Sequence, residues 1–377
     1  MTNDRFDVAV VGLGAMGSAA AYHLASRGVR VVGFDRYAPP HALGSSHGYT
    51  RIIREAYYEH PLYVPLVQRA YELWAELERA AGERLYIRTG GLMAGVEGGA
   101  LVQGALRSVR EHNLAHEVLE AAEVMRRFPA YRLASDWLAV YEPRAGLLLP
   151  EACIDAHLTL AAEAGAVLRL DEGVMEWRAD EHGVSVVTSH GTYHADRAIL
   201  AVGPWLPQMA NGARLPLVVE RQLSHWFMPL VTDGSCSADT CPLGLWEPSA
   251  DHLFLTTPDI GQGVKCGGHH DGFSTTPESV HREVSDEENA GAHAFLERVM
   301  PGAAGPLREA RVCLYTNTPD QHFLIDWHPD APRVLLASPC SGHGFKFSSA
   351  IGEILADLAS GALPQFDLSP FSLARFR

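Results

Sequence analysis

The sequence has a deficit of basic residues and no cysteines at metal-binding spacing. Its formal net charge is −15, and nucleic acids and anionic membranes are polyanions that a basic face must neutralise. We therefore expect neither as a partner, and an anionic substrate would need cations gathered locally. The six cysteines are scattered without a CxxC pair, which argues against a zinc site or a disulfide framework and favours a reducing compartment.

Long apolar runs are also absent. No stretch of about 18 apolar residues exists to span a bilayer, and the first apolar run, Val8 to Val11, meets a glycine at once, unlike a secretory signal. We therefore expect a cytoplasmic protein without membrane contact. At 377 residues the chain exceeds the usual size of one hydrophobic core, so we expect two domains.

The N-terminal segment has the pattern of a βαβ unit. Residues 6–11 are apolar except for Asp7 and rich in β-branched residues, which is typical of a parallel strand buried on both faces. An alanine-rich stretch over 16–27 ends at Gly28, as a helix should. Residues 29–34 then restart an apolar strand, so the order strand, helix, strand is complete.

A glycine fingerprint lies between the first strand and its helix. The run Gly12-Leu13-Gly14-Ala15-Met16-Gly17 has the spacing of a dinucleotide-binding turn, and Asp35 ends the second strand. We expect Gly12 to allow the tight turn, Gly14 to let the backbone approach a pyrophosphate, and Gly17 to let helix and strand pack closely. The helix N-terminus supplies partial positive charge, and Asp35 is expected to bind ribose hydroxyls.

The fingerprint alone does not separate FAD from NAD. Two features favour FAD: the motif lies at the very start of the chain, and a second glycine-bearing turn, Ser341 to Lys346, precedes the last predicted helix. A flavin is long enough to contact both. Backbone N–H groups after Gly344 would then face the flavin pyrimidine, where negative charge develops on reduction. An NAD-linked enzyme is the alternative, which a colourless preparation would support.

The remaining pattern predicts an α/β chain of two domains. An FAD-binding Rossmann-type domain comprises residues 1–89, 148–216 and 321–377, and a mixed-sheet α+β substrate domain comprises 90–147 and 217–320, where the regular alternation of strand and helix is lost. Within them we expect helices over 61–78 and 155–164, strands over 167–170 and 334–337, a hairpin of 184–188 with 192–195, a separate buried strand over 198–202, and a C-terminal helix after a turn at 341–344.

Several further motifs occur in the order found in one flavoprotein family. They are residues 44–54, Lys265 with His269, residues 311–318, residues 341–349, and the closing Phe-Asp-Leu-Ser-Pro-Phe of 366–371. With them the chain resembles the monomeric sarcosine oxidase and N-methyl-tryptophan oxidase family, which are FAD-dependent amino acid oxidases of the D-amino acid oxidase superfamily. The resemblance covers nearly the whole chain.

The resemblance implies FAD bound covalently, through a thioether from Cys313 to the flavin 8-methyl carbon. Such a link withdraws electrons and makes the flavin a stronger oxidant. His47 and Arg51 match positions beside the flavin ring, where positive charge or donated hydrogen bonds favour the reduced form. The residues expected to contact the cofactor are Gly12, Gly14, Ala15, Met16, Gly17, Asp35, Arg36, Ser45, His47, Thr50, Arg51, Val174, Gly203, Trp205, Cys313, Gly342, Gly344, Phe345 and Lys346.

Arg54 and Lys346 match the family residues that hold the substrate carboxylate. An arginine fork suits a planar carboxylate because it donates two parallel hydrogen bonds. Arg51 and Arg54 are three residues apart, so they share a face if this segment is helical. Taken alone, the two arginines are equally compatible with surface ion pairs to Glu55 and Glu59.

The remaining matches concern oxygen and the substrate pocket. Lys265 matches the lysine implicated in oxygen activation, where a cation would stabilise superoxide. His269 and Tyr315 match a pocket histidine and a pocket tyrosine. Phe254 stands where sarcosine-specific members place a tyrosine on the pocket strand, and Leu245 where a methionine is usual. A pocket without that hydroxyl should tolerate larger substituents.

The neighbouring residues His269 and His270 also raise the question of a metal. Adjacent strand residues point to opposite faces, and no further ligand spacing supports them. We therefore expect no metal.

Together these features predict an FAD-dependent oxidase of N-methyl amino acids such as sarcosine, acting as a monomer. The amine becomes an imine that hydrolyses, and O2 is reduced to H2O2. Alternatives are an oxidase of a cyclic or larger secondary amino acid (pipecolate, proline or N-methyl-tryptophan) and a flavin dehydrogenase with another electron acceptor, which peroxide yield would distinguish. A non-catalytic FAD-binding module would lack the set of Arg54, Lys265 and Lys346.

Overall fold

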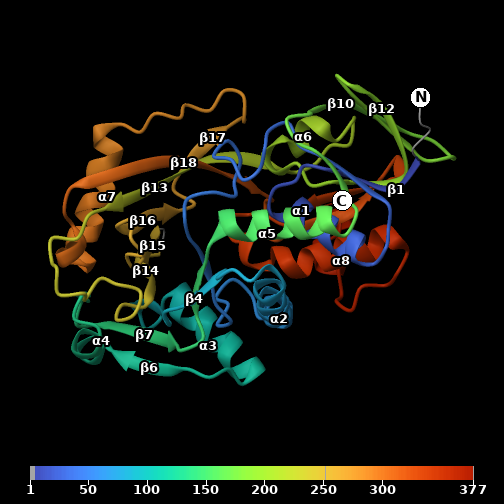
Figure 1. Cartoon of the computed structure of the whole chain (residues 1–377). Helices are drawn as coiled ribbons and strands as arrows, with labels where there is room; N and C mark the ends of the chain where they lie inside the picture. Colours follow the sequence, from blue (N-terminus) through green and yellow to red (C-terminus); the bar gives the residue numbers. More distant parts are fainter. Residues whose placement is uncertain (1–4, 251, 377) are drawn as a thin grey trace.

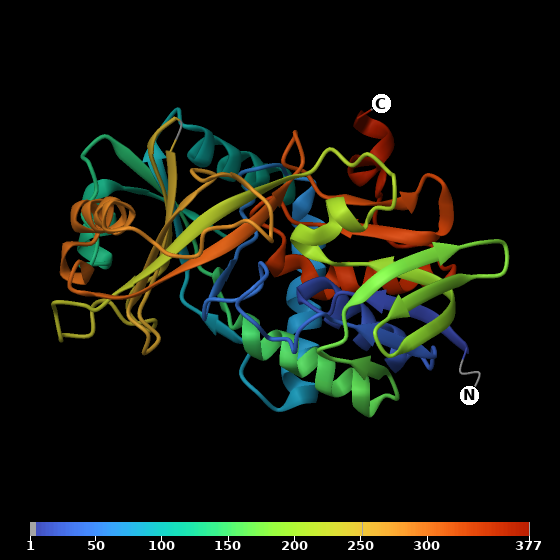
Figure 2. The same ribbon diagram turned by 90° about the horizontal axis from the view of Figure 1, so that it is seen from above.

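The computed structural model describes residues 5–250 and 252–376, which fold around two large β-sheets (Figure 1). Seen from above, the first sheet lies on the side of the N-terminus and the second on the opposite side, with its long strands reaching toward the middle (Figure 2). No helix within the described ranges is long and apolar enough to cross a bilayer.

The first sheet contains the predicted βαβ unit. Its central strand β1 (Arg5–Val11) lies between β2 (Val31–Phe34) and β12 (Gly191–Leu200) and runs parallel to both. Its other described strands are β9 (Val167–Arg169), β10 (Val174–Ala179), β11 (Val184–Thr188), β19 (Leu324–His328) and β20 (Ala331–Ser338). The parallel centre is what a nucleotide-binding α/β sheet requires.

Alternation along β1 places its side chains in two different cores. Val8 and Val10 belong to the core under the helices, whereas Ala9 and Val11 belong to the core on the other face. Both faces are buried from Val8 to Val11, which explains why this half of the strand is an uninterrupted apolar run.

Helices α1 (Ala15–Ser26), α5 (Pro150–Glu163) and α8 (Ser348–Ser360) cover one face of this sheet, and α2 (Tyr63–Ala81) packs on α5 and α8. Helices α1 and α8 meet at Gly352, where an added Cβ would lie 2.4 Å from the Cβ of Ala19. The missing side chain therefore sets the spacing of the two helices that frame the glycine turn.

The second sheet is mixed, because β14 (Leu243–Ser249) pairs in parallel with β5 (Gly91–Val96) while its other pairings are antiparallel. The longest pairing joins β13 (Val218–Phe227) to β18 (Leu307–Asn317). Its remaining strands are β6 (Glu117–Glu120), β7 (Trp137–Glu142), β15 (His252–Thr257), β16 (Val264–His269) and β17 (Phe273–Thr275). A separate core lies between this sheet and α7 (Asp286–Val299).

A third, small sheet is formed by segments that lie in the chain between strands of the two large sheets. In it β8 (Gly146–Leu148) lies between β3 (Arg51–Ile53) and β4 (Tyr86–Arg88). The other described helices are α3 (Ala100–His112), α4 (Ala121–Arg127), α6 (Leu206–Met209), and the short 3-10 turns η1 (Gly203–Trp205), η2 (Pro301–Ala303), η3 (Phe345–Phe347), η4 (Ser369–Phe371) and η5 (Leu373–Phe376).

The predicted α/β class is confirmed, whereas two local predictions are wrong. Residues 192–195 and 198–202 are not two strands: the former pair with β11 and residues 198–200 pair with β20, all within the single strand β12. The hydrophobic pattern changes within this one strand, because most residues of 191–197 are exposed or half-buried in the hairpin whereas 198–200 are buried in the core. The helices expected over 61–78 and 155–164 are Tyr63–Ala81 and Pro150–Glu163.

The division into two domains stays a prediction. Strands of the first sheet fall within the expected FAD-binding segments, and strands of the second fall within 90–147 and 217–320. The expected boundary between residues 147 and 148 lies inside β8 (Gly146–Leu148).

Replacing Gly352 by alanine is expected to destabilise the protein, because α1 and α8 must separate to admit the methyl group. Overpacking of this kind lowers the free energy of unfolding by about 1–3 kcal/mol. Gly291 in α7 is exposed with nothing near its Cβ position, so Gly291→Ala should be neutral or stabilising by up to about 1 kcal/mol. Urea unfolding of the two variants measures the contrast, and equal midpoints would contradict it.

Candidate active site

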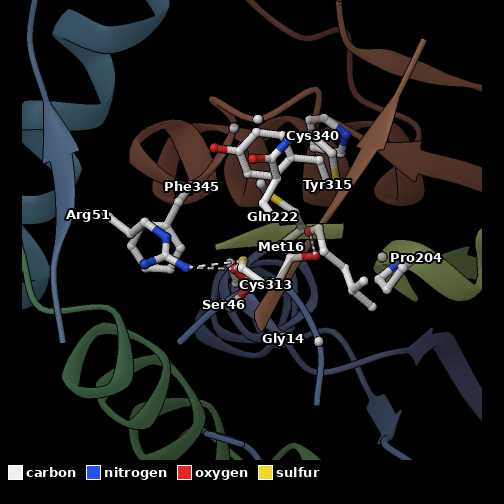
Figure 3. A pocket seen from close by; sticks show the side chains of 18 of the residues that line it. Gly14, Met16, Ser46, Arg51, Pro204, Gln222, Cys313, Tyr315, Cys340 and Phe345 are labelled. Carbon is white, nitrogen blue, oxygen red and sulfur yellow. Dashed lines mark hydrogen bonds between the residues drawn. The ribbon is translucent and has the colours of Figure 1, made fainter. Parts of the chain in front are cut away.

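A large cavity is lined by residues from both large sheets (Figure 3). It contains about 2170 Å³ of empty space, including the part that opens to solvent. Its wall brings together the glycine turn, the segment after residue 44, strands of the second sheet and the turn before α8. These are the four regions that the sequence singled out.

The glycine turn has the geometry of a dinucleotide site. Gly12 has φ +87°, and a Cβ there would lie 2.6 Å from the carbonyl oxygen of Ala201. A Cβ on Gly17 would lie 1.7 Å from the oxygen of Gly12, so this glycine packs strand against helix and does not line the cavity. A Cβ on Gly14 would meet only Ser46 Oγ, at 3.9 Å, which leaves the N-terminus of α1 open to a ligand.

Asp35 lies at the cavity wall beside this turn. Its Oδ2 accepts the backbone N–H of Leu13 at 2.7 Å and its Oδ1 accepts that of Tyr37 at 3.0 Å. Trp205, also in the lining, has an indole N–H without a partner among the described residues. Arg36, Val174 and Gly203 line the same cavity, as do Tyr37, Pro39, Pro40 and His41, which the sequence reasoning missed. Free polar groups beside a fixed carboxylate fit the adenosine half of a dinucleotide.

The second glycine-bearing turn is also crowded. Gly342 has φ +77°, and a Cβ there would lie 2.6 Å from the ring of Tyr315. A Cβ on Gly344 would lie 1.7 Å from the oxygen of Pro339. Phe345 and Lys346 then start the short turn η3 that continues into α8, and both line the cavity.

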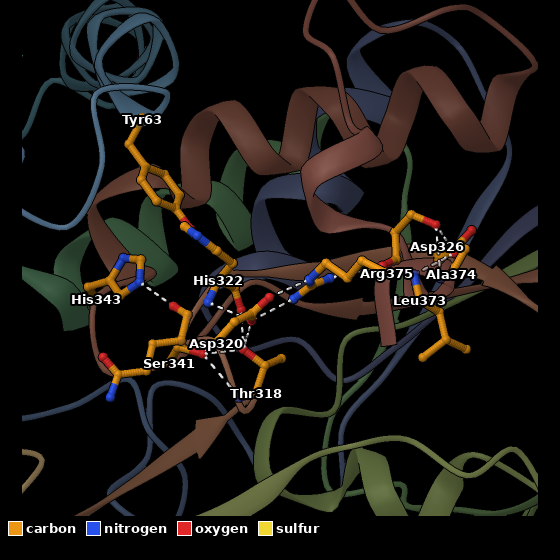
Figure 4. A network of polar contacts seen from close by, with 12 residues as sticks. Tyr63, Thr318, Asp320, His322, Asp326, Ser341, His343, Leu373, Ala374 and Arg375 are labelled. Atoms are coloured by element: carbon orange, nitrogen blue, oxygen red, sulfur yellow. Dashed lines mark hydrogen bonds and ion pairs between the residues drawn. The ribbon is translucent and has the colours of Figure 1, made fainter. Parts of the chain in front are cut away.

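A polar network fixes this second turn to the C-terminal residues (Figure 4). The carboxylate of Asp320 accepts from Arg375 Nε at 2.8 Å and from Thr318 Oγ1 at 2.9 Å. The hydroxyl of Ser341 donates to the oxygen of His322 at 3.3 Å. The turn is therefore held from outside as well as by its own close packing.

Cys313 lies on β18, faces the cavity and is held among polar groups of the segment after residue 44. Its thiol donates to the oxygen of Ser45 at 3.5 Å, and Arg51 Nη2 donates to its Sγ at 3.7 Å (Figure 3). Arg51 also donates to the oxygens of Ser45 and Thr50, each at 2.9 Å. Ser45 Oγ donates to the oxygen of Leu314 at 2.5 Å. Ser45, Thr50, Arg51 and Cys313 thus lie together, as the sequence predicted.

The segment that carries the two arginines is not helical. Residues 51–53 form β3, and Arg54 follows directly, so the two side chains do not share a helix face. Arg54 is 1% exposed and lines the cavity. Its Nη2 donates to both oxygens of Glu59, at 2.9 and 2.7 Å, and its guanidinium stacks on Tyr58 at 4.9 Å. The ion pair with Glu59 is real, but it is buried at the cavity and is not a surface pair.

Lys346 is buried in the same wall. Its Nζ donates to the oxygen of His343 at 2.8 Å and to Tyr57 Oη at 3.4 Å, which leaves one N–H for the cavity. Burial and the nearby charge of Arg54 lower the pKa of Lys346 to about 7. An anion in the cavity would favour the charged form.

Lys265 lies beside the segment after residue 44, which carries His47 and Arg51. Lys265 Nζ donates to the oxygens of Gly48 and Thr50 at 3.2 and 3.1 Å, and burial holds its pKa well below the usual value. Lys265 lines the cavity, but His47 does not. His47 is 4% exposed, neither ring nitrogen has a partner among the described residues, and burial with the charge of Arg51 lowers its pKa to about 3. The contact expected between His47 and a cofactor stays a prediction.

Lys265 and Lys346 are the two lysines of the sequence. Both are almost fully buried and both line this cavity. All other basic side chains with a permanent charge are arginines. An ammonium loses its charge far more readily than a guanidinium, so the chain places lysine where its surroundings alter the charge.

The predicted pocket residues are brought together with one exception. His269 Nδ1 and Tyr315 Oη form a hydrogen bond of 3.1 Å, and Leu245 lines the cavity with them. Phe254 does not: its ring stacks on Phe295 at 3.9 Å, in the core behind the sheet. Neighbouring strand positions face opposite ways, so the cavity side of β15 carries Leu253 and Leu255 instead.

The two neighbouring histidines do not point to opposite faces, contrary to the expectation. β16 ends at His269, and His270 has φ +59°, which turns its ring back to 4.3 Å from that of His269. Both rings lie beside Tyr315. Among the described residues no group of three or more histidine, cysteine or acidic side chains could hold a metal ion.

Sequence reasoning missed several cavity residues. The sequence suggests Glu59 only as a surface ion-pair partner. It also predicts Phe254 in the pocket, whereas its neighbours Leu253 and Leu255 line the cavity. Further lining residues include Tyr58, Gln222, Pro204 and Cys340, which no motif contains, and Ser46, which lies within the motif of residues 44–54. Most of these lie in loops or short turns, where local sequence patterns carry little information, whereas Gln222 lies in the middle of β13.

Comparisons with known proteins agree over almost the whole chain. Residues 7–358 match the family described as FAD dependent oxidoreductase. The chain is 41% identical over 358 residues to a monomeric sarcosine oxidase from Streptomyces avermitilis, covering 94% of this chain and 93% of that protein. It is 36% identical over 375 residues to an N-methyl-L-tryptophan oxidase from Salmonella heidelberg, covering 99% of each.

A solved structure is similar over almost the whole chain as well. NikD, an amino acid oxidase essential for nikkomycin biosynthesis, superposes with a TM-score of 0.85 at 26% identity, over 98% of this chain and 97% of that one. The matched region contains both glycine turns and the cavity between them. The chain belongs to the FAD-dependent oxidoreductase family, within which its full-length relatives are amino acid oxidases.

Proposed function

We propose that the protein is an FAD-dependent oxidase of N-methyl amino acids such as sarcosine. The observation that carries this function is the convergence of Arg51, Arg54, Lys265 and Lys346 on one cavity that also opens onto a dinucleotide turn. A protein with a net charge of −15 gathers its local cations there. The activities of the full-length relatives support the same reaction class.

The residues that would hold FAD fit its chemistry. The open N-terminus of α1 at Gly14 suits the pyrophosphate, and Asp35 suits the ribose of the adenosine half. The N–H groups of the turn at Gly344 suit the flavin pyrimidine. Cys313 is the cavity thiol proposed to form the thioether to the flavin. When bound, FAD supplies the two-electron oxidation of an amine to an imine and the passage of those electrons to O2, giving H2O2.

Arg54 and Lys346 are proposed to bind the substrate carboxylate. Arg54 presents a planar fork already oriented by Glu59 and Tyr58, and Lys346 retains one N–H for the cavity. Two such charge-assisted contacts fix the orientation of a small amino acid, which is the main contribution a site of this kind makes to rate.

The cavity also favours the reactive form of the amine. A neutral amine has the lone pair needed for loss of a hydride equivalent, and the surrounding cations disfavour a further positive charge. Leu245, Leu253 and Leu255 form an apolar wall that limits water near the reacting carbon. The imine hydrolyses in water, so an N-methyl substrate gives formaldehyde and the demethylated amino acid.

A larger or cyclic secondary amino acid is the second candidate. The three-leucine wall favours it, because apolar surface accepts extra carbons at little free-energy difference. A flavin dehydrogenase with another acceptor is less well supported, since Lys265 is buried at the cavity where a cation assists electron transfer to O2. We further propose that the enzyme acts as a monomer.

The function is tested by a peroxide assay on N-methyl, cyclic and primary amino acids under air. We expect one H2O2 per substrate oxidised, with secondary amino acids far ahead of primary ones. Arg54→Lys keeps the charge but loses the fork, so KM should rise about 10- to 100-fold. Arg69 pairs with Glu353 outside the cavity, and Arg69→Lys serves as the control. Substrate turnover without peroxide would contradict the oxidase.

Carboxylate binding is expected to depend on the charge of Lys346. The ammonium form binds an anion better, so binding of acetate should be constant below pH 7 and weaken as pH rises through the pKa of about 7. The limiting slope is about tenfold per pH unit. Acetate titrations followed by the flavin spectrum measure this, and the trend should vanish in Lys346→Met. Persistence of the same midpoint in that variant would assign the trend to another group.

The covalent link is tested by acid precipitation of the purified holoenzyme. Flavin colour should remain with the precipitated protein and should appear in the supernatant for Cys313→Ala. Cys340 is another cysteine in the cavity lining, and Cys340→Ala should retain the flavin. Release of flavin from the parent protein would rule out attachment at Cys313.

A further inference from the structure

The backbone turn over residues 48–50 forms a cage for the Lys265 ammonium. The oxygens of Gly48 and Thr50 accept two of its three N–H groups. The turn is tight, since Thr50 N also donates to the oxygen of Gly48 at 2.7 Å. Gly48 and Tyr49 have φ +99° and +62°, and a left-handed residue other than glycine needs support from its surroundings. The remaining N–H of Lys265 is available to the cavity that it lines.

Glu151 supplies that support from outside the turn. It lies in the first turn of α5, and its Oε1 accepts the backbone N–H of Gly48 at 2.7 Å and of Tyr49 at 3.3 Å. On the other side, Tyr49 Oη donates to Glu309 at 3.0 Å and accepts from Arg311. One carboxylate thus holds two amides of the turn, and the Tyr49 amide shares its peptide plane with the caging carbonyl of Gly48.

Glu151 also acts on Lys265 through its charge. Burial and the charges of Arg51 and Arg311 lower the pKa of Lys265, whereas Glu151 raises it, as does Cys313 in its ionised form. A thioether at Cys313 carries no charge, and burial keeps His47 neutral. Glu151 then remains as a carboxylate that opposes the arginines.

We propose that Glu151 is a positioning residue that fixes the turn over residues 48–50 and so directs the Lys265 ammonium at the cavity. This inference rests on the proposed function only in assigning Lys265 to the oxygen reaction. The positioning role of Glu151, called the clamp below, concerns the hydrogen bonds of the turn and the titration of the Lys265 amine. Both can be measured without turnover.

The two-lysine composition makes the amine directly observable. Holoenzyme labelled with 13C-lysine gives two ε-carbon signals, which Lys265→Met and Lys346→Met assign. In Glu151→Ala and Glu151→Gln, the titration midpoint of Lys265 should fall by about one pH unit, because a negative charge is lost. Asp155 is an exposed carboxylate on the same helix, and Asp155→Ala should leave the midpoint unchanged.

Amide hydrogen exchange separates the hydrogen bonds from the charge. In Glu151→Ala, exchange at Gly48 and Tyr49 should accelerate by about tenfold or more, as expected for loss of a charged acceptor. Glu151→Gln retains an acceptor oxygen, so its exchange should stay near that of the parent although its Lys265 midpoint falls. The glutamine variant also carries the test if the alanine variant fails to fold.

Stopped-flow kinetics complete the experiment. Anaerobic reduction by substrate should stay within about twofold of the parent in Glu151→Ala, whereas reoxidation by O2 should slow about tenfold, in the direction of Lys265→Met. Unchanged exchange and an unchanged Lys265 midpoint in Glu151→Ala would overturn the clamp. Rapid reoxidation of Lys265→Met would instead overturn the proposed oxygen site, while exchange and titration still decide the role of Glu151.

Discussion

Retention of positive charge inside a cavity is the constraint on which the rest of the site depends. Lys265, Lys346 and Arg51 are held by carbonyl and hydroxyl oxygens, and Arg54 pairs directly with a carboxylate, Glu59. Neutral acceptors satisfy the N–H groups without cancelling their charge. Burial of incompletely compensated charge is unfavourable by several kcal/mol, so these groups would stabilise an anion bound in the cavity.

The elements around the cavity serve this constraint from separate parts of the chain. The segment after residue 44 supplies carbonyl groups, β16 and η3 supply one lysine each, and β18 supplies the cysteine. None of these elements carries the set alone. The close approach of α1 and α8 at Gly352 and the buried glycine turns hold them in register, because each leaves no room for a side chain.

Much of this arrangement was predictable, for identifiable reasons. The glycine turn follows from local rules, since φ +87° at Gly12 and the contact at Gly17 exclude any other residue. The roles proposed for Cys313, Lys265 and Lys346 depend on motifs in family order, because no local pattern distinguishes a cavity lysine from an exposed strand lysine.

The failures have physical reasons as well. Phe254 was placed in the pocket although a shift of one position reverses the face of a strand, and the ring of Phe254 packs in the core on Phe295. His270 escapes the alternation rule because its backbone is left-handed. No sequence motif includes Glu151 or Glu59. Their roles arise from partners distant in sequence or from burial, which a single sequence does not reveal.

The confinement of both lysines to one cavity has a consequence for handling the protein. Reagents that couple through side-chain amines, and proteases that cut after lysine, find neither target on the folded surface. A support that captures proteins by amide formation would have to disturb the site in order to attach through lysine. Carboxylate or engineered thiol chemistry is therefore the compatible route for building a substrate-sensing electrode from this enzyme.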